Sequence, residues 1–113
     1  MKQFALKFTP ENLKRHLDYD TDYIVTTRDD LKARIGDVTI IGDGMYRVES
    51  IYELYISGVS EITQTVIWEY IARLEGFYHA PDFASELERI YGELTGKIMY
   101  TYFLRRLREE EKE

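Results

Sequence analysis

The run Tyr23–Arg28 carries residue types that can hold a polar ligand. Its β-branched and aromatic composition predicts a strand, whose side chains alternate between two faces. Thr26 and Arg28 then share a face, with a hydroxyl and a guanidinium about 7 Å apart. Such a pair can bind a carboxylate, a phosphate or a base edge, because the guanidinium donates in a plane and the hydroxyl rotates to fit. The alternative is a solvated strand face. The opposite face is expected to pack on the core through Tyr23, Val25 and Thr27.

Glu75 is a second candidate, because it lies in the last turn of a predicted helix, directly before Gly76. The negative end of the helix dipole disfavours a carboxylate there by a few tenths to about 1 kcal/mol. A broken local preference points to a tertiary partner or to a function. The position would also raise the pKa of Glu75, as a general base near neutral pH requires. Arg28 is a natural counter-ion, and the alternative is an exposed carboxylate beside Arg73.

A small α+β domain must position these residues. Alternation of apolar residues predicts strands at 3–8, 23–28, 38–41, 45–57 and 97–104, the fourth with a bulge near Ile51–Tyr52. A loop with a helical turn is expected at 29–35. The first helix begins at Thr9-Pro10-Glu11, with threonine as the N-cap and proline at the first helical position. Further helices are predicted at 61–75, capped by Ser60, and at 81–91.

Helical spacing of apolar residues predicts which faces are buried. In the helix 61–75 the predicted buried stripe consists of Ile62, Val66, Ile67, Tyr70, Ile71 and Leu74, with Trp68 at its edge. In the helix 81–91 the inward residues are expected to be Phe83, Leu87, Ile90 and Tyr91.

Composition limits the classes of function. The 113 residues fit one domain, predicted to span 1–105 and to be followed by a charged, disordered tail at 106–113. The formal charge of −6 argues against a broad surface that follows nucleic-acid phosphates, but it leaves room for a local pocket. The chain has no cysteine, and His16 and His79 lack ligand spacing, so neither a metal nor another cofactor is expected.

No membrane association is expected, because no apolar run approaches the roughly 20 residues that a spanning helix needs. The segment Met1–Phe4 becomes polar too early for a signal peptide. We therefore expect a cytoplasmic protein, and a monomer by default.

The segment Thr21–Arg28 carries the main part of a family resemblance. Thr26 and Arg28 fit the end of the pattern G-x-K-x-x-T-x-R, while Thr21 and Tyr23 stand in place of its glycine and lysine. This pattern is the signature of the ASCH family, which belongs to the PUA-like superfamily of RNA-associated domains. The chain resembles that family over residues 3–105, in the order of its elements as well as in this motif.

Two further matches support the resemblance. Gly36-Asp37 matches the family's Gly-Asp before the third strand, and Glu75 falls where members carry a carboxylate, here followed by Gly76-Phe77. The resemblance implies a small PUA-like mixed β-barrel of about five to six strands with two to three helices.

The resemblance implies an RNA-, nucleotide- or nucleobase-binding module. Its small pocket would lie between the second strand and the end of the long helix, with Tyr23, Thr26, Arg28 and Glu75 as ligand-binding residues. Tyr23 would stack on a base.

An alternative is an amidohydrolase acting on acetylcytidine or another modified nucleoside, with Thr26 as nucleophile and Glu75 as proton-transfer partner. Tyr23 replaces the family's lysine, which shifts the interpretation from hydrolysis towards binding. Hydrolysis would need a substitute cation, such as Lys32, Lys97 or an arginine. A third alternative is a non-catalytic protein-interaction domain whose interface is marked by surface tyrosines and Trp68.

Overall fold

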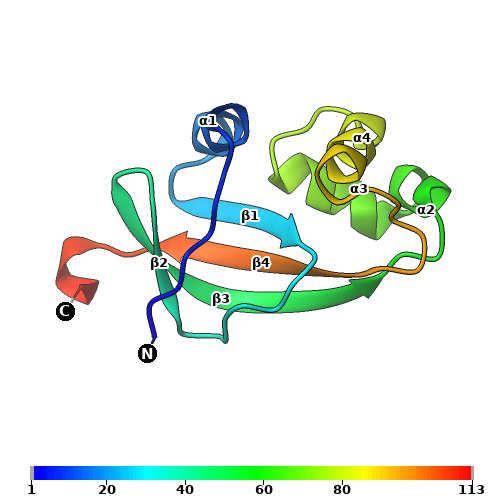
Figure 1. Ribbon diagram of the computed structural model, residues 1–113. Coiled ribbons are helices and arrows are strands. Elements are labelled where there is room, and N and C mark those ends of the chain that lie inside the picture. The colour runs from blue at the N-terminus through cyan, green and yellow to red at the C-terminus, as the bar shows by residue number, and fades with distance from the viewer. Residues whose placement is uncertain (1, 113) are drawn as a thin grey trace.

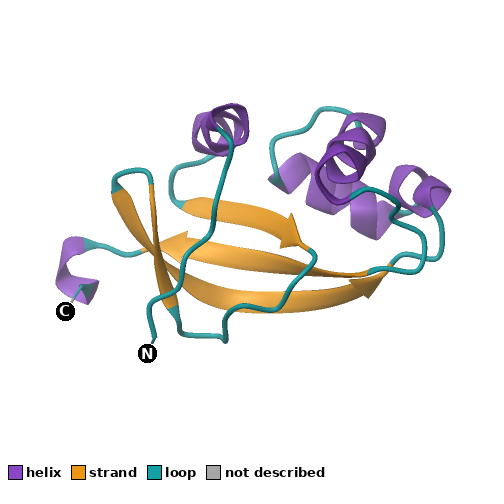
Figure 2. Ribbon diagram, viewed as in Figure 1, coloured by secondary structure: helices purple, strands orange, loops and turns teal. Residues whose placement is uncertain are grey.

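The computed structural model describes residues 2–112 and has an open, four-stranded antiparallel sheet with helices above it (Figures 1 and 2). The strands are β1 (Tyr23–Arg28), β2 (Val38–Ile41), β3 (Gly44–Tyr55) and β4 (Ile98–Arg106), in the spatial order β1-β4-β3-β2. The α+β class is therefore confirmed. The described residues form four strands in an open sheet, where five to six strands in a barrel were expected. β1 lies at one edge of this sheet.

The strand predicted at residues 3–8 is wrong. Gln3 makes only an isolated parallel bridge to Val38, with the amide of Phe4 donating to the Val38 carbonyl at 3.0 Å. The segment then leaves the sheet and rises to α1 (Pro10–Tyr19) (Figure 1). The alternating apolar side chains are still used, since Leu6 is buried and Phe8 packs beside it.

The beginning of α1 is as predicted. The Thr9 hydroxyl accepts from the amide of Asn12 at 3.2 Å, and Pro10 occupies the first turn. This arrangement satisfies one of the free amides at the helix start, and proline has no amide to satisfy. The loop at 29–35 has no helical turn.

The single helix predicted at 61–75 is wrong, because the structure contains α2 (Val59–Gln64) and α3 (Val66–Leu74) separated by Thr65. Thr65 has extended backbone angles, and its hydroxyl donates to the carbonyl of Glu61 at 3.0 Å. Thr65, Val66 and Ile67 are consecutive β-branched residues, which lose side-chain freedom in a helix. The N-cap of α2 is Gly58, not Ser60.

The break also changes which face of α3 is buried. Trp68, placed at the edge of the predicted stripe, is only 2% exposed, whereas Val66 is 81% exposed. Ile67 and Tyr70 of the predicted stripe also lie on the exposed side. Because α3 is a separate helix that begins after Thr65, its buried face need not continue the apolar pattern of α2. That face is instead the one that carries the large indole ring of Trp68.

α4 (Ala80–Tyr91) completes the helical layer. Phe83 and Leu87 are buried as predicted, but Ile90 is exposed. The bulge of β3 lies between Val48 and Ser50, slightly before the predicted position.

Two apolar clusters lie over opposite ends of the sheet. The first, which we call the helical core, lies under α2, α3 and α4 and consists of Ile56, Ile62, Trp68, Ile71, Ala72, Phe83, Ala84, Leu87, Leu94 and Met99. The second, which we call the sheet core, lies beside α1 and consists of Leu6, Ile24, Ala33, Ile41, Tyr46, Val48, Tyr102 and Leu104. Figure 1 shows α1 over one end of the sheet and the other helices over the opposite end.

The charged segment 106–113, predicted as a disordered tail, begins with Arg106 at the end of β4 and contains the 3-10 helix η1 (Glu109–Glu111), while its last residue lies outside the described part of the chain. The Arg105 guanidinium pairs with Glu111 at 2.7 Å and with Glu49 at 3.2 Å. Among residues 2–112, none of the helices is long and apolar enough to span a membrane.

Candidate functional site

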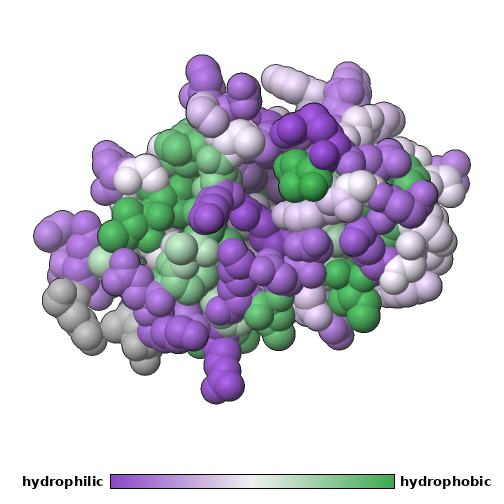
Figure 3. Space-filling model, viewed as in Figure 1, coloured by the Kyte–Doolittle hydropathy of each residue, from purple (hydrophilic) through white to green (hydrophobic). Residues whose placement is uncertain are grey.

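A cavity of about 340 Å³ lies between the two cores, bounded by α1, the edge strand β1, the end of α3, and α4. On the face shown in Figure 3, hydrophilic side chains lie above and below the hollow between α1 and the other helices, and a hydrophobic side chain borders it. Its apolar walls come from Phe83 and Leu87 of the helical core and from Phe8, which packs against the sheet core. The volume is near the lower end of the usual range for small-ligand pockets.

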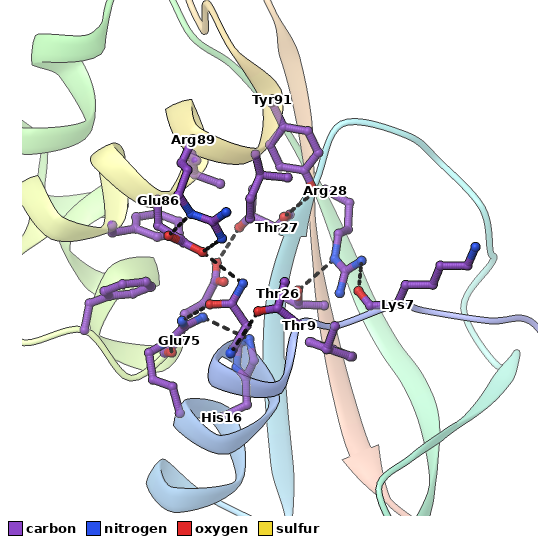
Figure 4. A pocket seen from close by; sticks show the side chains of 17 residues that line it. Lys7, Thr9, His16, Thr26, Thr27, Arg28, Glu75, Glu86, Arg89 and Tyr91 are labelled. Atoms are coloured by element: carbon purple, nitrogen blue, oxygen red, sulfur yellow. Dashed lines mark hydrogen bonds and ion pairs between the residues drawn. The ribbon is translucent and has the colours of Figure 1, made fainter.

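Three of the four predicted ligand-binding residues line this cavity: Thr26, Arg28 and Glu75 (Figure 4). Tyr23 does not line it, and its side chain is 54% exposed. Tyr23 lies at the opposite end of β1 from Arg28, so the structure separates it from the other three. The expected stacking of Tyr23 on a ligand in this cavity is therefore wrong.

Thr26 and Arg28 contact each other directly, on one face of β1 as predicted. The Nε of Arg28 donates to the Thr26 hydroxyl at 3.0 Å, and its Nη1 donates to the carbonyl of Lys7 at 2.9 Å (Figure 4). The guanidinium also stacks over the Phe8 ring, with 4.6 Å between its central carbon and the ring centroid. These contacts hold the arginine at the cavity wall through its Nε and Nη1 groups.

Glu75 is buried, at 4% exposure, which excludes the alternative of an exposed carboxylate beside Arg73. Its partner is Thr27, whose hydroxyl donates to Glu75 Oε2 at 2.6 Å (Figure 4). The Thr27 hydroxyl also lies 2.8 Å from that of Thr101 on β4. Thr27 was predicted only to face the core, so sequence reasoning missed its contact with the carboxylate. The alternation of side chains along β1 correctly places Thr26 and Thr27 on opposite faces. The Glu75 carboxylate lies on the side of Thr27.

Burial raises the pKa of Glu75 to about 7. The hydrogen bond from Thr27 and the charges of Arg15 and Arg28 oppose this rise. Desolvation disfavours the charged form of a carboxyl group, and here it outweighs the neighbouring donors and cations. Near neutral pH this group can therefore either hold a proton or accept one.

Arg15 of α1 fixes the position of Glu75. Its Nε donates to the main-chain carbonyl of Glu75 at 2.8 Å, and its guanidinium lies over the Phe77 ring, 4.1 Å from the centroid. A third contact runs from Nη1 to the side-chain oxygen of Asn12. The Arg15 guanidinium is thus bound by other residues of the chain, and its role is to position Glu75.

His16 is a buried residue that sequence reasoning did not place at the site. Burial and the charges of Arg15 and Arg28 lower the pKa of His16 to about 3, so the ring is neutral at physiological pH. Its Nε2 lies 3.3 Å from an Arg15 nitrogen, and the ring packs edge-on against Phe8 at 5.3 Å. Because a guanidinium only donates, Nε2 accepts, and the ring proton resides on Nδ1.

The charged side chains of the lining are mainly cationic, although the chain as a whole is acidic. The cations are Lys7, Arg15, Arg28 and Arg89, and the anions are Glu75 and Glu86. Arg89 is paired with Glu86, at 2.6 and 2.9 Å, and Glu86 accepts from Asn12 at 3.0 Å across the gap between α1 and α4. Lys32 and Lys97, considered as substitutes for the family's lysine, do not line the cavity, whereas Lys7 does.

The arrangement suits a small polar or anionic molecule with an aromatic or apolar part. Within residues 2–112 there is no group of three or more histidine or acidic side chains placed to hold a metal ion. Comparison with family models, with curated proteins and with solved structures gave no match for this chain.

Proposed function

We propose that the protein binds a nucleobase, a nucleotide or the end of a single-stranded RNA in the cavity at the edge of β1. The observation that carries this proposal is that Thr26 and Arg28 of β1 and Glu75 at the end of α3 line one cavity. Arg28 supplies a fixed cation for a phosphate or a base edge, and Phe8 and Tyr91 supply ring surfaces near it.

We also propose that the chain is related to the ASCH family. Its open four-stranded sheet would then correspond to a reduced form of the PUA-like barrel. The net charge of −6 favours a short ligand over a long RNA, because phosphate contacts along a strand need a basic surface.

The test is a titration followed by amide resonances, using cytidine, cytidine monophosphate and a short single-stranded RNA. We expect shifts at Thr26, Arg28 and Glu75, and tighter binding of the phosphate-bearing ligands. Arg28→Ala should weaken binding of the monophosphate about tenfold or more, as expected for a hydrogen-bonded charge. Arg34→Ala is the matched control, because Arg34 is exposed and does not line the cavity. No shift with any of the three ligands would reject the proposal.

A second candidate is hydrolysis of an acetylated nucleoside, favoured by the buried pair of Thr27 and Glu75. Glu75 would take the proton of a threonine hydroxyl, whose oxygen attacks the acetyl carbonyl. The amine would leave with that proton, and water would then split the threonine ester to acetate and restore the hydroxyl. Lys7 or an arginine would supply the cation.

Release of acetate from acetylcytidine tests this candidate. Thr26→Ala and Thr27→Ala should be compared, because the resemblance implies the first threonine and the hydrogen bond to Glu75 favours the second. Turnover retained in both variants would reject a threonine nucleophile here, and no acetate from the unmodified protein would reject hydrolysis of this substrate.

A further inference from the structure

Tyr91 occupies the last position of α4 and lines the cavity, with its ring directed towards β1 (Figure 4). Its hydroxyl donates to the main-chain carbonyl of Thr27 at 3.5 Å, which is the long limit of a hydrogen bond. Two other tyrosines of the fold are held more tightly. The hydroxyl of Tyr46 donates to the main-chain carbonyl of Thr21 at 2.6 Å, and that of Tyr102 donates to the main-chain carbonyl of Asp30 at 2.8 Å. Compared with them, the Tyr91 hydroxyl is held loosely.

The Thr27 carbonyl is an acceptor at a free sheet edge. In an antiparallel ladder, alternate residues turn their main-chain groups towards the neighbouring strand and the others turn them away. β1 pairs with β4 on one side only, and the Thr27 carbonyl meets Tyr91, so it points away from β4 into the cavity. The acceptor therefore lies next to the tyrosine hydroxyl.

The hydroxyl is well suited to donate. Burial raises the pKa of Tyr91 to about 12, so the group keeps its proton throughout the physiological range. A neutral phenol can donate one hydrogen bond and also accept one. Together the Thr27 carbonyl and the Tyr91 hydroxyl place an acceptor beside a donor. They are therefore complementary to a ligand edge that carries a donor beside an acceptor.

We propose that Tyr91 and the Thr27 carbonyl read the amide-like edge of the bound base, and that Tyr91 is a specificity-determining residue. A donor of the base, such as an exocyclic amine, bonds the Thr27 carbonyl, and the adjacent ring nitrogen or carbonyl accepts from Tyr91. The ligand thereby replaces the weak contact at 3.5 Å with two shorter ones. This inference rests on the proposed function, and it names the feature of the ligand that the cavity recognises.

The experiment compares three ligands and three proteins by calorimetric titration. The ligands are cytidine, its analogue pyrimidin-2-one riboside, which lacks the exocyclic amine, and ribose 5-phosphate, which has no base. The proteins are the unmodified chain, Tyr91→Phe and Tyr55→Phe, the last as a control because Tyr55 is exposed and lies outside the cavity. Thermal melting of each protein verifies that it is folded.

We expect Tyr91→Phe to bind cytidine about tenfold more weakly, the effect of one neutral hydrogen bond, and to bind ribose 5-phosphate unchanged. The unmodified protein should bind the analogue about tenfold more weakly than cytidine, a result that does not depend on any variant folding. Equal binding of cytidine by Tyr91→Phe and the unmodified protein, or equal binding of the two nucleosides by the unmodified protein, would overturn the inference while leaving nucleoside binding intact. Failure of the unmodified protein to bind either nucleoside would overturn nucleoside binding as well.

Discussion

The helical core and the cavity share a boundary at Phe83 and Leu87, but only the cavity also encloses polar side chains. The helical core encloses apolar groups such as Trp68 and Ile71, whereas the cavity beside it contains buried polar groups such as Glu75 and His16. Burial of apolar surface stabilises a fold, while burial of a polar group costs free energy unless it is hydrogen-bonded. The contrast separates apolar residues, which stabilise the fold, from buried polar residues, whose free-energy cost is explained by a role in a binding site. Four predictions test this division, from the largest expected effect to the smallest.

Trp68→Ala should lower the free energy of unfolding by about 3–5 kcal/mol, since it removes a fully buried aromatic ring from the helical core. The matched control is Tyr70→Ala, two residues away on the exposed side of α3, with an expected change within about 0.5 kcal/mol. Urea denaturation measures both. Equal losses would mean that the buried face of α3 is assigned incorrectly.

The dependence of stability on pH should show that the two buried titratable groups of the cavity oppose each other. Glu75 has a pKa raised from 4.5 to about 7, so between these values the folded chain binds an extra proton and stability falls as pH rises. His16 has a pKa lowered from 6.5 to about 3, so the unfolded chain binds an extra proton in that window and stability rises with pH. From about pH 5 to 6.5 the two slopes cancel.

Glu75→Gln should remove one slope and leave stability rising by about 1.4 kcal/mol per pH unit near pH 5, and by about half of that near pH 6.5, where the unfolded histidine is half protonated. His16→Gln should give the opposite slope over the same window. The carboxyl groups whose pKa is lowered, including Glu61 and Glu86, act mainly below this range. Denaturation at four pH values measures these slopes, and a steep slope in the unmodified protein would contradict the cancellation.

Thr27→Val should destabilise the fold by about 1–3 kcal/mol, because it keeps the side-chain shape but leaves the buried Glu75 carboxyl and the Thr101 hydroxyl without their partner. Thr26→Val is the control, since the Arg28 nitrogen that it frees lies in a partly exposed position. We expect the smaller loss there. A greater loss of stability for Thr26→Val would mean that the stabilising hydrogen bonds lie on the Thr26 face of β1 and not on the Thr27 face.

Gly76→Ala and Gly36→Ala should differ by roughly 1 kcal/mol, the lower end of the cost of an overpacked contact. Both glycines have positive φ, of +90° and +96°, so both variants carry the same backbone strain. A Cβ at Gly76 would also lie 3.0 Å from the Arg15 Cγ and 3.2 Å from its carbonyl, whereas a Cβ at Gly36 meets nothing within 4 Å. Thermal melting compares the two, and equal losses would show that α1 moves freely away from the site.

Local chemistry accounts for the parts of the fold that were predicted from sequence. The cap at Thr9, the glycine that follows Glu75 and the alternation along β1 depend on neighbouring residues, and such patterns can be read along the chain. The break at Thr65 could have been recognised from three consecutive β-branched residues, but the apolar spacing across it favoured one helix. The size of Trp68, which the stripe left at its edge, then decided the packing of α3.

The site was only partly predictable for a different reason. Thr26 and Arg28 are two residues apart on one strand, so their contact follows from strand geometry. The bond from Thr27 to Glu75 joins residues on different elements, and nothing in local spacing selects Thr27 over Thr26 as the partner. Tyr91 was predicted to face inward, as it does, but a ring directed into a cavity and one directed into a core have the same helical spacing.

The position of the cavity between the two cores has a practical consequence. A molecule held there contacts α1 and β1 on one side and α4 on the other, so it ties together parts of the chain that would otherwise separate during unfolding. A ligand that binds only the folded chain adds about 2.7 kcal/mol of stability at a concentration one hundred times its Kd. A compound library can therefore be screened by its effect on the melting temperature, before any reaction is known, and slowed amide exchange on both sides of the cavity would identify the true occupants.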